Sequence, residues 1–243
     1  MEILPAIDLR DGRCVRLLQG DYDRQIRYAD DPVAQAAQFA EAGARWVHVV
    51  DLDGAKEGRP CNLDVIAAII RATPAAVEVG GGIRDDAAVA SLLDAGAARV
   101  VIGTRALEDW DWFRTLVQRP GHEDRIALGL DAREGRLAVR GWTRGIDRGA
   151  VDVAAEVSGW PLGAIIYTDI SRDGMLLGPN VEATCAVAAA TRVPVVASGG
   201  VTCMEDVRRL AELPLGGIII GRALYEKQID LAEAVRVAAA GRG

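Results

Sequence analysis

Short apolar runs alternate with amphipathic or alanine-rich segments along the whole chain. Most of these runs are nearly continuous in Val, Ile and Ala, which is typical of parallel strands that are covered on both faces. They predict strands at Glu2–Asp8, Trp46–Asp51, Ala76–Gly80, Val100–Gly103, Ile126–Asp131, Ala164–Thr168, Pro194–Ser198 and Gly217–Ile220. The segments between them predict helices, among them Asp31–Glu41, Leu63–Arg71, Asp85–Asp94, Val181–Ala190 and Met204–Leu210.

Strand and helix patterns therefore form eight successive units. Eight such units in 243 residues favour a single α/β domain with the (β/α)8 TIM-barrel fold. An open, doubly wound sheet is the alternative, because periodicity alone does not show whether a sheet closes on itself.

The second half of the chain repeats motifs of the first half. The segment Ile7-Asp8-Leu9-Arg10-Asp11-Gly12-Arg13 returns as Leu130-Asp131-Ala132-Arg133-Glu134-Gly135-Arg136. Three further pairs are each 118 positions apart (180 − 62, 200 − 82 and 221 − 103), namely Asn62 and Asn180, Gly82 and Gly200, and Gly103 and Gly221. We expect one domain, 1–243, built from two half-barrels at about 1–123 and 124–243, in which Asp8 and Asp131 are symmetry mates.

Two connections are unusually long for this fold. Residues 9–30 follow the first strand and residues 132–151 follow the fifth, with short extended stretches at Cys14–Leu18 and Leu137–Trp142. Long loops in a compact domain are usually binding elements or lids. In a barrel, both would lie at the C-terminal mouth beside the two related aspartates.

Glycine-rich strand ends suggest where an anion binds. Gly81 and Gly82 follow the third strand and Gly103-Thr104 the fourth, and their counterparts are Gly199 and Gly200 after the seventh and Gly221-Arg222 after the eighth. Glycine allows close approach of the backbone, and a helix start offers free amides to an anion. The glycines could instead only form tight turns. The equal spacing in both halves favours two phosphate sites on opposite sides of the mouth.

The candidate chemistry is carried by carboxylates. Asp8 ends a buried strand, and a partly desolvated carboxylate at a barrel mouth can act as a general base. Asp131 has the same position in the second half and could supply the matching acid, although either residue could be structural. Asp51 and Asp53 form a third acidic group that could equally make salt bridges, and His48 could be a packed histidine.

Composition limits the possible partners. The chain has 28 basic and 35 acidic side chains and a net charge of −7, which argues against a nucleic-acid or membrane-surface protein. Four cysteines without C-x-x-C spacing and two histidines do not predict a metal site, and no cofactor motif is found. No signal-peptide pattern and no apolar run of 18 residues occurs, so we expect a cytoplasmic protein.

Several longer motifs together resemble one family. They are Asp8-Leu9-Arg10-Asp11-Gly12-Arg13 with Gln19-Gly20, His48-Val49-Val50-Asp51-Leu52-Asp53-Gly54-Ala55, Gly80-Gly81-Gly82-Ile83-Arg84, and Thr168-Asp169-Ile170-Ser171-Arg172-Asp173-Gly174 with Gly178-Pro179-Asn180. Through nearly its whole length, the chain is similar to the phosphoribosylformimino-aminoimidazole carboxamide ribonucleotide (ProFAR) isomerases of histidine biosynthesis. The related cyclase family typically has a Cys-x-Asp first motif, where this chain has Ala6-Ile7-Asp8.

The resemblance implies a cofactor-free Amadori rearrangement of an aminoaldose bisphosphate to its aminoketose. We expect the protein to be a monomer. Asp8 would be the general base, Asp131 or Asp173 the acid that opens the ribose ring, and Thr168 a substrate-holding neighbour. The expected substrate contacts are Arg16, Gly20, His48, Gly81, Gly82, Gly103, Thr104, Trp142, Gly178, Ser198, Gly199, Gly200, Gly221 and Arg222. The family usually has Thr where Met175 follows Gly174, which leaves the behaviour of that loop less well defined than the core chemistry.

Two other functions stay open from the sequence. Some actinobacterial relatives also isomerise phosphoribosylanthranilate in tryptophan synthesis, and the stretch Arg140-Gly141-Trp142 could serve either substrate. A non-catalytic barrel that binds phosphate ligands is the second alternative. Asp8 and Asp131 argue against it, because carboxylates would only repel a bisphosphate ligand.

Overall fold

The structure is a computed structural model that describes residues 1–18, 21–175 and 177–240. Eight parallel strands pair around a ring in the order β1–β4–β5–β6–β7–β10–β11–β12, and β12 pairs back with β1. Their bounds are β1 Glu2–Arg10, β4 Trp46–Asp51, β5 Ala76–Gly80, β6 Arg99–Ile102, β7 Ile126–Arg133, β10 Ala164–Asp169, β11 Val195–Ser198 and β12 Gly217–Ile220. The sheet is therefore closed, and the open-sheet alternative is wrong.

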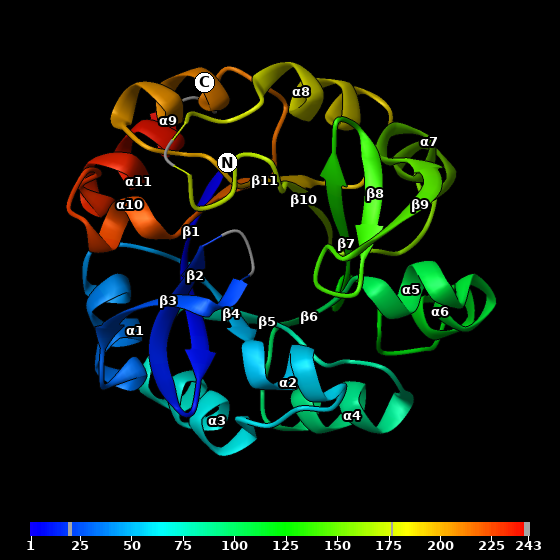
Figure 1. Ribbon diagram of the computed structural model, residues 1–243, viewed down its shortest axis with the longest axis horizontal. Coiled ribbons are helices and arrows are strands. Elements are labelled where there is room, and N and C mark those ends of the chain that lie inside the picture. The colour runs from blue at the N-terminus through cyan, green and yellow to red at the C-terminus, as the bar shows by residue number, and fades with distance from the viewer. Residues whose placement is uncertain (19–20, 176, 241–243) are drawn as a thin grey trace.

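The helices form an outer ring around these strands (Figure 1). They are α1 Pro32–Glu41, α2 Leu52–Glu57, α3 Leu63–Ala72, α4 Asp86–Asp94, α5 Thr104–Glu108, α6 Trp110–Val117, α7 Ala150–Glu156, α8 Val181–Ala189, α9 Met204–Ala211, α10 Arg222–Tyr225 and α11 Leu231–Ala240. α1 follows Asp31 directly, and the Asp31 carboxylate caps the helix by accepting from the backbone amides of Val33 and Ala34 at 3.0 and 2.9 Å. Among the described residues, no helix has the length and apolar character needed to cross a membrane.

The strands carry apolar side chains on both faces. Along β1, Ile3 and Ile7 belong to the large core between sheet and helices, whereas Leu4 and Ala6 belong to a second cluster inside the barrel. This alternation follows from the two-residue period of a strand. Asp8 has the same parity as Leu4 and Ala6, so its carboxylate is directed into the barrel mouth rather than toward the helices.

Two β-hairpins extend the barrel where the sequence predicts its long connections. β2 Arg13–Leu18 and β3 Asp21–Ala29 follow β1, and β8 Arg136–Val139 and β9 Arg144–Gly149 follow β7. Antiparallel pairing with β2 and β8 also prolongs β1 and β7 by two residues beyond their predicted ends. The predicted extended stretch Leu137–Trp142 is wrong at its end, because β8 stops at Val139. Arg140, Gly141 and Trp142 have φ values of 57, 62 and 69°, which turn the chain sharply into β9.

The repeated asparagines hold equivalent loops. Asn62 donates from Nδ2 to the Asp51 carboxylate at 2.7 Å, and Asn180 donates from Nδ2 to the Asp169 carboxylate at 2.7 Å. Asp51 and Asp169 are themselves 118 positions apart (169 − 51), at the ends of β4 and β10. Asp51 also accepts from the amides of Gly54, Cys61 and Asn62. Asp51 is therefore a structural carboxylate that fixes the loop after β4.

We predict that Asn62→Ala destabilises the fold more than Asn180→Ala. Asn62 is buried and also bonds to Asp53 and to the amide of Gly12, so its loss leaves several buried polar groups unpaired. An unsatisfied buried group costs about 1–3 kcal/mol. Denaturant unfolding of both variants, with exposed Gln228→Ala as the control, measures the difference. Equal stability of Asn62→Ala and wild type would contradict the assignment.

Candidate active site

A cavity of about 300 Å³ opens at the C-terminal ends of the barrel strands. Three carboxylates line it: Asp8 near the end of β1, Asp131 in β7 and Asp173 in the loop after β10. The structure thus brings together the three aspartates that the sequence singled out, although they are far apart in the chain. Asp8 is buried, and its strand register places it beside Val15 of β2 and Val50 of β4.

Asp131 has an environment that favours its protonated form. Removal from water raises the pKa of this carboxyl, and the nearby Asp173 carboxylate acts in the same direction. Hydrogen bonding from Trp142 and Thr168 opposes this shift without cancelling it. The indole Nε1 of Trp142 donates to Asp131 Oδ2 at 3.0 Å, so the β8–β9 hairpin closes over the carboxyl. A raised pKa is the property that a general acid requires.

The turn that carries Trp142 is fixed to the neighbouring α5. The amide of Arg140 donates to Thr104 Oγ1 at 2.9 Å, and Arg140 Nε bonds to Glu108 Oε1 at 2.6 Å. These contacts hold three successive residues in the left-handed region, where a non-glycine residue is strained. The predicted substrate contacts Thr104 and Trp142 therefore lie on two elements that are joined to each other.

The first glycine pair (Gly81, Gly82) lies where any side chain would collide with backbone. A Cβ on Gly81 would lie 2.2 Å from the Asp51 carbonyl oxygen, and one on Gly82 would lie 2.4 Å from that of Gly54. Both residues have positive φ, 103 and 72°. Close packing and positive φ therefore both require glycine at these two positions.

The second glycine pair (Gly199, Gly200) repeats this arrangement. Cβ atoms there would lie 2.8 Å from the Asp169 carbonyl oxygen and 2.6 Å from that of Gly178, with φ values of 90 and 85°. Gly178 therefore lies behind the pair, and it is not among the residues that line the described cavities.

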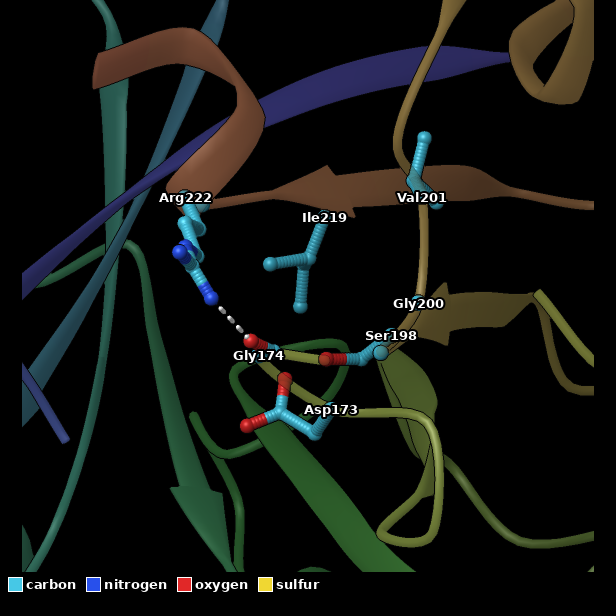
Figure 2. A pocket seen from close by; sticks show the side chains of 9 residues that line it. Asp173, Gly174, Ser198, Gly200, Val201, Ile219 and Arg222 are labelled. Atoms are coloured by element: carbon cyan, nitrogen blue, oxygen red, sulfur yellow. Dashed lines mark hydrogen bonds between the residues drawn. The ribbon is translucent and has the colours of Figure 1, made fainter. Parts of the chain in front are cut away.

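A smaller cavity of about 30 Å³ adjoins the second glycine pair, next to Asp173, Ser198 and the start of α10 (Figure 2). In Figure 2 the Arg222 side chain is directed at the Gly174 carbonyl, to which Nη1 donates at 2.8 Å. Arg222 Nε bonds to Glu226 at 2.6 Å. The guanidinium thus ties the loop after β10 to α10. The guanidinium is therefore engaged within the protein, and the groups of Gly221 and Arg222 that can face an anion are their backbone amides at the start of α10.

The four helix starts near the glycine-rich loops are not alike. α4 is capped by Asp85, which accepts from the Ala88 amide, and before α9 the Asp206 carboxylate accepts from the amides of Thr202 and Cys203. At the starts of α5 and α10, Gly103 and Gly221 supply no side-chain cap among the described contacts. Their backbone angles are nearly identical, with φ −102 and ψ −95° against φ −105 and ψ −101°. Of these four helix starts, the two at α5 and α10 are therefore open to an anion.

Sequence reasoning assigned no role to two cations at the main cavity. Arg84 and Arg105 line it together with Arg140, the first glycine pair and Thr104. Arg84 and Arg105 follow the glycine-rich strand ends directly, which is a signal that the sequence contained. The second half has Thr202 and Ala223 at the equivalent positions (84 + 118 and 105 + 118). The cationic side chains that line the main cavity are therefore concentrated beside the first glycine pair.

The other predicted contacts are partly placed by the structure. His48, Thr168 and Ser198 line the main cavity, and Ser198 also lines the smaller one. Gly20 lies outside the described residues, as does the side chain of Arg16, whose backbone belongs to β2.

A closed barrel with acid–base residues gathered at its C-terminal mouth places this chain among the (β/α)8-barrel enzymes. Residues 2–230 match the family described as "Histidine biosynthesis protein", and the chain belongs to that family. The resemblance noted from the sequence is confirmed.

Three relatives show how far the similarity extends. A protein of Parasynechococcus marenigrum (strain WH8102) is 51% identical over 246 residues, which cover 100% of this chain and 95% of the relative. Proteins of Moorella thermoacetica and Rhodospirillum rubrum are each 48% identical over 99% and 98% of this chain and 100% of their own lengths. All three are named 1-(5-phosphoribosyl)-5-((5-phosphoribosylamino)methylideneamino)imidazole-4-carboxamide isomerase.

We predict that Gly82→Ala and Gly200→Ala raise KM for a bisphosphate substrate by similar factors. Each added Cβ meets a carbonyl oxygen and must displace the loop that approaches the anion. Gly135→Ala is a matched control, because Gly135 has φ 78° with nothing within 4 Å of its Cβ position. It reports the cost of positive φ alone.

Sulfate bound in crystals provides a second check of the same prediction. We expect it to occupy both glycine-rich loops and inorganic phosphate to inhibit competitively, because open amides at α5 and α10 favour anions. Sulfate at one loop, with the other closed by side chains, would refute the two-site arrangement.

Proposed function

We propose that this chain is a cofactor-free aldose–ketose isomerase that converts the aminoaldose bisphosphate ProFAR into its aminoketose in histidine biosynthesis. The observation that carries the proposal is the gathering of Asp8, Asp131 and Asp173 in one cavity between two glycine-rich loops. The names of full-length relatives support the same substrate. A ligand with a phosphate at each end fits a mouth with one open helix start in each half.

The first step needs an acid at the ribose ring oxygen. Protonation of that oxygen breaks its bond to C1 while the nitrogen lone pair forms a C=N bond, which opens the ring. Asp131 suits this role, because burial and Asp173 raise its pKa and keep a proton available. Asp173 is the competing candidate, since it lies close enough to affect Asp131 and lines both cavities.

The second step needs a base at C2. Loss of the C2 proton converts the C=N bond into an enolamine, which tautomerises to the aminoketose. Asp8 suits this role because it is directed into the cavity from the opposite half of the barrel. Thr168 lies beside Asp131 in the strand register and would hold the substrate between the two carboxyl groups.

Phosphoribosylanthranilate is a second candidate substrate. It undergoes the same ring opening and C2 proton loss but carries one phosphate. Arg140 and Trp142 line the cavity and could contact its anthranilate carboxylate or ring. A competition assay with both substrates separates a dual-specificity isomerase from a specific one.

We further propose that the enzyme acts as a cytoplasmic monomer on small molecules, without nucleic acid or membrane partners. The net charge of −7 supports the absence of nucleic-acid and membrane-surface partners, since a polyanion would be repelled. Sedimentation at micromolar concentration would contradict the monomer if it gave a dimer mass.

We predict that Asp8→Asn lowers kcat by about 10²–10⁴-fold, the range for loss of a general base. The substitution is nearly isosteric, so stability and substrate affinity should change little. Turnover of ProFAR, with calorimetric binding as the control for affinity, measures both. A variant within tenfold of wild-type kcat would remove Asp8 from the base role.

We predict that Asp131→Asn removes the alkaline limb of the pH–rate profile. An acid must be protonated, so activity is lost as the pH rises through its raised pKa, whereas the base causes the loss at low pH. Asp173→Asn should lower the rate but retain the limb. If Asp173→Asn alone removes it, the two residues exchange roles within the same site.

A further inference from the structure

A row of three charged or polar residues crosses the interior of the first half-barrel. His48 of β4 pairs in register with Glu78 of β5, and Glu78 pairs in register with Arg99 of β6. All three side chains are buried, and Glu78 is 0% exposed. They lie in the barrel interior, the environment in which the second apolar cluster is found.

The three side chains form one connected network. His48 Nδ1 lies 2.5 Å from Glu78 Oε1, and Arg99 Nε donates to the other carboxylate oxygen at 2.7 Å. Arg99 also donates to that oxygen through Nη2 and to the Gly163 carbonyl through Nη1, and its guanidinium lies 4.5 Å from the centre of the Trp46 ring. Burial alone would raise the pKa of Glu78, but His48 and Arg99 outweigh it, and the pKa is lowered. Glu78 is therefore ionised.

The repeat shows that the fold does not require this network. Adding 118 to 48, 78 and 99 gives Ile166, Val196 and Gly217, which pair with each other in the same register on β10, β11 and β12. Ile166 and Val196 belong to the apolar cluster inside the barrel. The same sheet positions are thus filled by apolar residues in one half and by an ionic row in the other.

Stability is a poor explanation for the ionic row. Burying an ion pair often gains no more than well-packed apolar residues of similar volume, because desolvation offsets the attraction. The network instead ends at the main cavity, which His48 lines. An ionised carboxylate only accepts hydrogen bonds, so Nδ1 of His48 must be the donor. In the neutral ring, donation from Nδ1 leaves Nε2 unprotonated, so that Nε2 is the hydrogen-bond acceptor on the cavity side.

We propose that Glu78 and Arg99 are positioning residues that hold the His48 ring so that its Nε2 accepts a hydrogen bond from a substrate hydroxyl or N–H group. The inference rests on the proposed function for the identity of the substrate. Among the described contacts, the hydrogen bond of His48 is made through Nδ1, so Nε2 is available at the cavity. Because Ile166 replaces His48 in the other half, this contact distinguishes the two sides of a nearly symmetric mouth.

A pair of His48 variants separates the contact with the cavity from the contact with Glu78. Asn can replace Nδ1 and keep the bond to Glu78, whereas Gln can place a polar atom near the position of Nε2. We expect His48→Asn to fold normally and to raise KM by about 10–100-fold, the effect of one lost hydrogen bond. His48→Gln should recover part of this loss. A purely structural histidine would give the reverse order.

A double variant tests the positioning residues. Glu78→Val with Arg99→Leu removes both charges together, so that no unpaired ion is left in the core, whereas Glu78→Val alone buries the Arg99 charge and should lower Tm. We expect the double variant to keep a Tm near that of wild type and to raise KM with little change in kcat. An unchanged KM in the folded double variant would overturn the positioning role.

Nitrogen NMR of the imidazole rings tests the same point without turnover, and the chain has only two histidines to assign. We expect His48 to be protonated at Nδ1 and unprotonated at Nε2, and its Nε2 signal to shift when ProFAR binds to the Asp8→Asn variant. The opposite tautomer would overturn the inference even if the double variant failed to fold. If the wild-type enzyme turns over ProFAR and the His48→Asn variant has the same KM, this inference alone is contradicted. A wild type that binds no ProFAR would contradict the proposed function instead.

Discussion

Closure of the parallel sheet is the constraint on which the rest of the structure depends. Once β12 pairs with β1, all eight strands point the same way and their C-terminal ends meet at one mouth. Residues at strand ends that are more than a hundred positions apart, such as Asp8 and Asp131, are then forced into one cavity. The inward parity of each strand decides which side chains enter it. The chemistry therefore follows from topology first and from local sequence second.

Duplication supplies the frame, and departures from it supply the chemistry. The clamps made by Asn62 and Asn180, the two glycine pairs and the backbone angles at Gly103 and Gly221 are equivalent in both halves. A symmetric frame offers two similar places for anions. An isomerisation needs an acid and a base with different properties, and identical surroundings could not provide them. The raised pKa of Asp131 and the ionic row of His48, Glu78 and Arg99 are features that break the symmetry.

Burial of ionisable groups inside the barrel and at its mouth has a structural cost that the surrounding elements offset. Asp131 is partly buried and receives hydrogen bonding from Trp142, whose turn is held in the left-handed region by contacts with Thr104 and Glu108. Glu78 is ionised within the core because His48 and Arg99 surround it. Functional sites often store strain and desolvated charge in this way, provided that the scaffold holds them in place.

The sequence alone determined the fold class and the set of catalytic candidates. Eight apolar runs predicted all eight barrel strands, because buried parallel strands leave a signal within a few adjacent residues, and the repeat pointed to Asp8, Asp131 and the glycine pairs. Closure of the sheet and the turn at Arg140–Trp142 depended on contacts between distant segments. The network of His48, Glu78 and Arg99 was hidden for the same reason, since three strands must pair in one register before these residues meet. A local pattern determines which elements form, whereas pKa values and positions at the site depend on what the tertiary structure places beside each group.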